Sequence, residues 1–141
     1  MTARIMAIDY GTKRVGIAFS DPLGLFATPH SVLENAGFAA LLSEIQKLIE
    51  AQNVNLVLVG MPYAIDGSLS PKTKETLEFM KDLQQSLQTR VIPYDERYSS
   101  CEAEAELKKM GKTWQQARKM VDAMAAAMIL KSYLENAQDA K

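Results

Sequence analysis

The stretch IMAIDYGTKRVGIAFSD, residues 5–21, decides the fold of this chain. It contains two short apolar runs separated by a Gly-Thr-Lys-Arg turn, a pattern that predicts a strand, a tight turn and a second strand. Asp9 ends the first run, beside the hydroxyl of Thr12 and the positive charges of Lys13 and Arg14. This group suits a phosphate or a divalent metal ion. A turn-capping role explains Asp9 equally well at this point.

Length and composition restrict the classes of protein that fit. A chain of 141 residues is long enough for one well-buried core, so we expect a single domain over residues 1–141. Its net charge of −1 means that any nucleic acid must be held by a local patch and not by bulk charge. One cysteine, Cys101, allows no intrachain disulfide and no cysteine-cluster zinc site. The sequence shows neither a membrane-spanning run nor a signal peptide, so we expect a cytoplasmic protein with no membrane partner.

The rest of the chain alternates between helical and strand patterns. A third strand over 26–33 follows so closely that the first three strands should pair antiparallel. Helical periodicity predicts helices over 38–52 and from Pro71, which Ser70 would cap. Strands are predicted over 56–60 and 90–95, and Pro93 favours the sheet edge for the second of these. Capping signals at Ser99 and Thr113 open two further helices.

This order predicts an α/β fold with a mixed five-stranded sheet and helices on both faces. Three strands would pair antiparallel, and the fourth and fifth would be added parallel to the first. The strand ends at Asp9, at Gly60 and at Asp95 and Glu96 then lie along one edge of the sheet. Open α/β sheets bind their ligands at that edge.

Two more carboxylates are candidates for a site at this edge. Glu96 comes directly after an apolar strand, although a solvated loop residue would look the same. Asp122 lies on the last predicted helix, close to a core side that we expect to consist of Val121, Met124, Ala125, Met128, Ile129 and Leu134. Carboxylates are seldom placed beside a core without a partner. The alternative is that Asp122 interacts favourably with the N-terminal end of the helix dipole.

Asp9, Glu96 and Asp122 together are more informative than each alone, because clustered carboxylates repel unless protons or cations intervene. Oxygen-only ligands select Mg²⁺ or Mn²⁺, and two such ions can support hydrolysis of a phosphodiester. Nearby cations could hold the phosphates of the substrate; these are Lys13, Arg14, Arg97, Arg118 and Lys119.

The chain resembles the YqgF/RuvX family of proposed Holliday junction resolvases, now regarded as nucleases of pre-16S rRNA maturation, within the RNase H-like superfamily. The resemblance covers nearly the whole chain. It is carried by residues 8–16 (IDYGTKRVG), Ser20-Asp21, Gly60-Met61-Pro62 with Asp66-Gly67, Asp95-Glu96-Arg97 and residues 119–123 (KMVDA). Small departures, such as Met61 where leucine is usual, concern substrate contacts more than chemistry.

The resemblance implies an RNase H-like, divalent-metal-dependent endonuclease that acts in 5′-end maturation of pre-16S rRNA. Its metal-binding catalytic acids would be Asp9, Glu96 and Asp122, and the substrate-binding residues would be Thr12, Lys13, Arg14, Arg97 and Lys119. Resolution of Holliday junctions, with branched DNA as the partner, is the alternative. An actin-like ATPase is disfavoured by the short chain, and a non-catalytic nucleic-acid module by the three intact acids. No heptad seam is visible, so we expect a monomer or weak homodimer.

Overall fold

The computed structural model describes residues 3–63, 66, 68–95 and 114–139. Its strands are β1 (Arg4–Asp9), β2 (Arg14–Ser20), β3 (Ala27–Glu34), β4 (Val54–Met61) and β5 (Arg90–Asp95). Its helices are α1 (Phe38–Gln52), α2 (Pro71–Ser86) and α4 (Trp114–Asp139). The helix predicted from Ser99 lies outside the described residues.

The five strands form one sheet in the order β3-β2-β1-β4-β5. β1–β2 and β2–β3 are antiparallel, whereas β4 pairs parallel with both β1 and β5. This is the predicted mixed sheet, and β5 with its Pro93 is an edge strand as predicted. The carboxyl ends of β1, β4 and β5 therefore share one edge.

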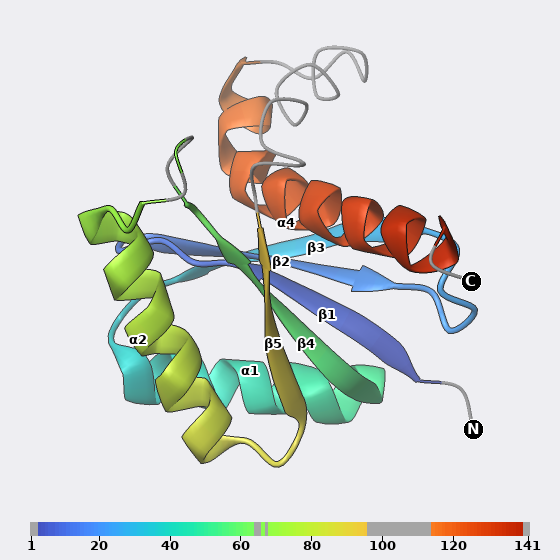
Figure 1. The fold of residues 1–141 in the computed structure, drawn as a ribbon, viewed down its shortest axis with the longest axis horizontal. Helices are drawn as coiled ribbons and strands as arrows, with labels where there is room; N and C mark the ends of the chain where they lie inside the picture. The colour runs from blue at the N-terminus through green and yellow to red at the C-terminus, as the bar shows by residue number, and fades with distance from the viewer. Residues whose placement is uncertain (1–2, 64–65, 67, 96–113, 140–141) are drawn as a thin grey trace.

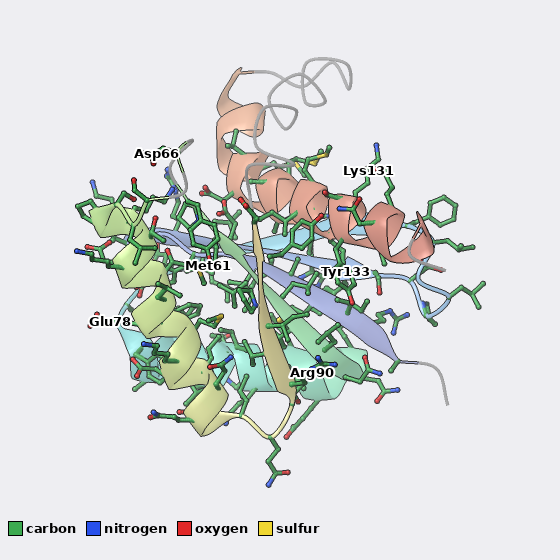
Figure 2. The ribbon with its side chains drawn as sticks, viewed as in Figure 1. Met61, Asp66, Glu78, Arg90, Lys131 and Tyr133 are labelled. Carbon is green, nitrogen blue, oxygen red and sulfur yellow. The ribbon has the colours of Figure 1, made fainter. Side chains whose placement is uncertain are left out.

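Helices cover both faces of the sheet (Figure 1), as predicted. α1 and α2 pack on one face, whose buried strand residues include Ile8, Ile17 and Val59. α4 packs on the opposite face, against Ala7, Ala18 and Leu58. In Figure 2, Tyr133 points from α4 toward the sheet and Lys131 points away from it. No helix within the described ranges combines the length and apolarity that crossing a membrane requires.

The buried side of α4 agrees with the prediction at four of six residues, because Met124, Met128, Ile129 and Leu134 are buried. Val121 and Ala125 are only half-buried. Four further residues of α4 that were not predicted are also buried, namely Ala123, Ala126, Ala127 and Leu130. Ala126 and Ala127 pack with Ala7 and Ala18 of the sheet, where short side chains on both elements let the helix lie close to the strands. The helix continues to Asp139.

Polar side chains fix two connections. The Ser70 side chain caps α2 by accepting a hydrogen bond from the Thr73 amide at 3.2 Å, as predicted. The buried Thr73 hydroxyl donates to the Pro62 carbonyl oxygen at 2.7 Å, which ties α2 to the segment after β4. Between β2 and β3, the Asp21 carboxylate accepts hydrogen bonds from the amides of Leu23, Leu25 and Phe26.

Candidate active site

Gly16 brings Asp9 and Asp122 to the same place on the sheet. Asp9 pairs with Gly16 across β1 and β2, so the two residues share a face. A Cβ added to Gly16 would lie 1.9 Å from the carbonyl oxygen of Asp122 and 2.9 Å from the backbone nitrogen of Ala123. The backbone of α4 at Asp122 therefore rests directly on Gly16, next to Asp9. Two of the three predicted acids, from the first strand and the last helix, are thus neighbours.

Arg14, the first residue of β2, forms an ion pair at this place. Its Nε atom donates to Oδ2 of Asp122 at 3.2 Å. The side chains are 57% and 27% exposed, so water screens the pair and it adds little to folding stability. Its effect is local: it fixes the direction of the Asp122 carboxylate and sets one positive charge beside the acids.

The turn between β1 and β2 is held by Asn35. The Asn35 side-chain amide donates to the Gly11 carbonyl oxygen at 2.8 Å, and its backbone amide donates to the Lys13 carbonyl oxygen at 2.9 Å. A Cβ on Gly11 would lie 2.4 Å from the Arg14 carbonyl oxygen, so this turn has room only for glycine. These contacts fix the backbone between Asp9 and Arg14.

Thr12 and Lys13 have exposed side chains on this turn. Thr12 lines a cleft of about 280 Å³ whose other lining residues include Tyr10, Phe79, Glu75, Glu78 and Asp82. Tyr10 stacks on Phe79 there, with ring centroids 4.2 Å apart, on the side of α1 and α2. The three carboxylates make that cleft unfavourable for a phosphate, so a phosphate contact by Thr12 would have to be made on the Asp9 side of the turn.

The remaining predicted site residues are placed only in part. Glu96 and Arg97 lie outside the described residues. Lys119 belongs to the first half of α4, ahead of Asp122. Within the described parts of the chain, no three His, Cys, Asp or Glu side chains form a group that could hold a metal ion. A three-carboxylate site thus depends on Glu96.

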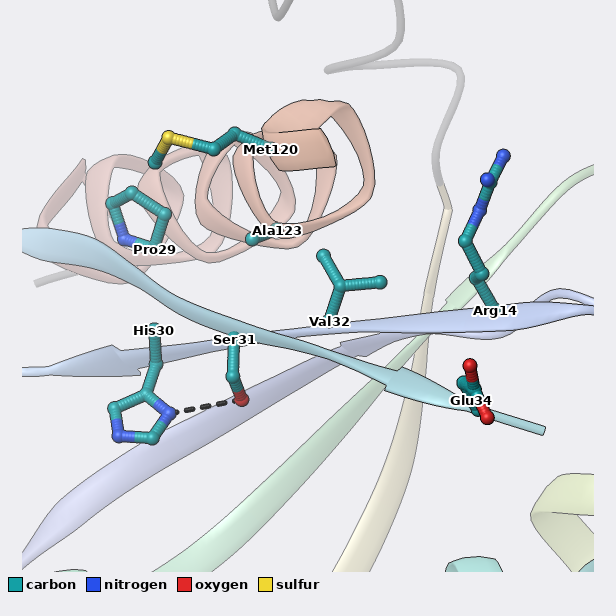
Figure 3. Close-up of a pocket in the computed structure, with 8 residues that line it drawn as sticks. All are labelled: Arg14, Pro29, His30, Ser31, Val32, Glu34, Met120 and Ala123. Carbon is teal, nitrogen blue, oxygen red and sulfur yellow. Dashed lines mark hydrogen bonds between the residues drawn. The ribbon is translucent and has the colours of Figure 1, made fainter. Parts of the chain in front are cut away.

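A second cleft, which the sequence did not predict, adjoins the ion pair. It has a volume of about 390 Å³ and lies between β3 and α4 (Figure 3). Arg14 lines one end, and Val32 and Ala123 line the middle. Gly16 is the feature of the sequence that could have indicated the close packing of α4 here, because a glycine inside an apolar strand often marks a close approach of another backbone.

The donor set fits a hard divalent cation. Asp9 and Asp122 offer carboxylate oxygens, the ligands that Mg²⁺ and Mn²⁺ prefer, at the sheet edge where α/β proteins bind ligands. Arg14 adds a cation that can also bind phosphate through its fork of N–H donors. The arrangement can hold a cation and a phosphate group side by side.

Relatives of known description match nearly the whole chain. A protein of Syntrophomonas wolfei, described as a candidate pre-16S rRNA nuclease, is 40% identical over 132 residues, which cover 94% of each chain. One of Maridesulfovibrio salexigens with the same description is 37% identical over 134 residues, 95% of this chain and 99% of the relative.

Solved structures share the fold at low identity. Thermus thermophilus RuvC in complex with a Holliday junction superposes with a TM-score of 0.59 at 14% identity and covers 95% of this chain and 96% of RuvC. The fowlpox virus resolvase bound to junction DNA gives 0.59 at 15%, covering 95% and 98%. The five-stranded sheet is therefore of the RuvC-like, RNase H-like kind. The family model described as "RuvX: Holliday junction resolvase" matches residues 3–136. The chain belongs to the RuvX family.

Proposed function

We propose that this protein is a divalent-metal-dependent endonuclease that cleaves phosphodiester bonds in pre-16S rRNA during 5′-end maturation in the cytoplasm. One observation carries the proposal: Gly16 lets α4 place Asp122 beside Asp9, at the ligand edge of an RNase H-like sheet. Residues 1–141 act as one nuclease domain.

In this proposal each charged residue has a role. Asp9, Asp122 and Glu96 hold Mg²⁺ or Mn²⁺, which when bound activates water and stabilises the leaving oxygen. Arg14 keeps the Asp122 carboxylate in place and binds substrate phosphate with Lys13, Thr12, Arg97 and Lys119. A histidine is not required as a general base, because the metal ion that the carboxylates would hold activates the water itself.

The relatives support an RNA substrate, because the Syntrophomonas wolfei protein, which is 40% identical over 94% of the chain, is named for pre-16S rRNA. Holliday junction resolution is the second candidate, because the RuvC and fowlpox structures of the same fold hold junction DNA. Symmetric resolution needs two sites in a two-fold dimer. We expect a monomer or weak homodimer, which favours the RNA.

A parallel assay tests the function. Purified protein is incubated with labelled pre-16S rRNA and with a four-way DNA junction, each with Mg²⁺, Mn²⁺ or EDTA. We expect metal-dependent cleavage of the RNA and loss of that cleavage in Asp9→Asn, with an unchanged circular dichroism spectrum. Glu44→Gln, an exposed acid on α1, serves as the matched control. Cleavage at the wild-type rate by Asp9→Asn would refute the assignment.

A further inference from the structure

The cleft between β3 and α4 is aligned with the candidate catalytic acid. Asp9 pairs with Gly16, and Gly16 pairs with Val32, so the three residues form one row across β1, β2 and β3. Adjacent strands lie about 4.8 Å apart, which puts Val32 about 10 Å from Asp9 along that row. Asp122 sits above the middle of the row, over Gly16.

An irregularity in β3 gives this cleft an apolar wall. Ile17 pairs with Ser31 and Ala18 pairs with Pro29, so His30 is an extra residue in β3. The His30 ring contacts Phe19 edge-on at 5.0 Å, on the sheet face covered by α1 and α2. Pro29 and Val32 are thereby both placed on the opposite face, beneath α4. Bulges of this kind are frequent at sheet edges and next to active sites.

The cleft combines an apolar middle with one charged end, and His30 and Ser31 of β3 also line it. Pro29 and Val32 on β3 face Met120 and Ala123 on α4 (Figure 3). At one end, Arg14 and Glu34 are partners in register, so they contribute one charge of each sign. The half-buried Met120 supplies a flexible and polarisable thioether, which packs well against aromatic rings. A volume of about 390 Å³ is that of a small-ligand site.

A nucleobase matches these properties better than a phosphate does. It has flat apolar faces with donors and acceptors at its edges, whereas a phosphate needs an excess of positive charge. We propose that this cleft binds the base of a nucleotide adjacent to the cleaved phosphate, and this inference rests on the proposed nuclease function. A base paired in a duplex cannot enter, so the substrate must have an unpaired base at that position.

Abasic substitution tests the inference. Single-stranded RNA oligonucleotides carrying the mapped cleavage site are made with one base removed at each flanking position in turn. For the wild-type protein we expect one position at which removal lowers kcat/KM about ten- to a hundredfold, the size of stacking effects in single-strand binding. Equal cleavage of all the oligonucleotides would overturn the base site and leave the nuclease function standing.

Substitutions in the cleft assign that effect to its walls. Met120→Ala removes one wall and Val32→Phe fills the cleft, so both should cleave the intact and abasic RNAs at nearly equal rates. Met120→Leu restores the wall and should restore the discrimination. Thr28→Ala, on the exposed part of β3 outside the cleft, is the control. An undiminished abasic effect in both Met120→Ala and Val32→Phe overturns the inference.

A binding measurement separates this inference from the proposed function. 2-Aminopurine replaces the sensitive base in the RNA, and its fluorescence is followed on binding to Asp9→Asn. We expect a change that Val32→Phe abolishes in the Asp9→Asn background. A fluorescence change that Val32→Phe leaves intact, or no change at all, overturns the base site while the nuclease function stands. If the wild-type protein cleaves no RNA with either metal, the nuclease function fails and this inference fails with it.

Discussion

At the scale of single residues, Gly16 determines how close the last helix comes to the sheet. Gly16→Ala would place a methyl group 1.9 Å from the Asp122 carbonyl oxygen, so α4 would have to move. We expect a loss of at least about 2 kcal/mol in the free energy of unfolding. Cleavage per folded molecule should fall as well, because Asp122 moves with the helix. Urea denaturation and initial cleavage rates measure the two effects.

Gly37→Ala is the comparison for this variant. Gly37 has a φ of 107° and nothing within 4 Å of an added Cβ, so alanine there costs only backbone strain of about 1–3 kcal/mol. Cleavage per folded molecule should remain at the wild-type level. If Gly37→Ala and Gly16→Ala lower cleavage per folded molecule equally, the position of Asp122 does not explain the loss.

Substitution of Arg14 tests whether this residue contributes to folding stability or to substrate binding. Because the pair is exposed, Arg14→Ala should change the unfolding free energy by less than about 1 kcal/mol. RNA binding should weaken, and the slope of log K against log salt concentration should become shallower by about one, as expected for the loss of one phosphate contact. Arg14→Lys keeps the charge and should keep most of that slope. Loss of the fold with an unchanged salt slope would make Arg14 a structural partner of Asp122 only.

At the scale of elements, the loop between β2 and β3 is ordered by one carboxylate. Hydrogen bonds from backbone amides, above all that of Phe26, lower the pKa of Asp21. A lowered folded-state pKa gives stability that is present above the unfolded-state pKa and is lost as the pH falls through the folded-state value. The carboxyl carbon of Asp21 should therefore titrate below the ordinary aspartate value of about 3.9 in NMR. A midpoint at or above that value contradicts the role of these hydrogen bonds.

Two buried threonines of α2 offer a matched comparison. Thr73→Val leaves the Pro62 carbonyl oxygen without its donor, which should cost about 1–3 kcal/mol. The Thr76 hydroxyl donates to the Lys72 carbonyl oxygen in the same helix, so Thr76→Val should cost less than about 1 kcal/mol. Thermal unfolding of both variants measures the difference, and equal losses would show that the Pro62 contact adds nothing.

The strands and their pairing could be predicted from the sequence, but the packing of α4 on the sheet could be predicted only in part. Short links between the first strands required antiparallel pairing, and Pro93 required an edge, so the sheet could be predicted. The part of α4 that packs most closely on the sheet could not be, because alanines such as Ala126 count little in a hydrophobic pattern although they pack against the strands. The Arg14–Asp122 pair could not be predicted either, because it joins residues 108 positions apart in the chain. Only Asp9 and Asp122 of the predicted acids are brought together by the described residues.

At the scale of the whole molecule, the described residues bring together one pair of candidate acids in each chain, and a single site of this kind would limit action on junctions. In sedimentation velocity experiments at micromolar concentration we expect a monomer or weakly associating dimer. A four-way junction should then receive single, uncoordinated nicks and be cleaved more slowly than pre-16S rRNA. A tight dimer that makes paired symmetric nicks faster than it cuts the RNA would reverse the preference between the two substrates.

The ion pair between Arg14 and Asp122 spans 108 residues, and this separation has a consequence during protein synthesis. A ribosome adds about 5–20 residues per second, so β2 is made about 5–20 s before Asp122. Throughout that interval the nascent chain lacks one of the two acids that Gly16 brings together. With Asp122 as a catalytic acid, as proposed, a chain released by a stalled ribosome before this residue is made should be unable to cut the RNA around it.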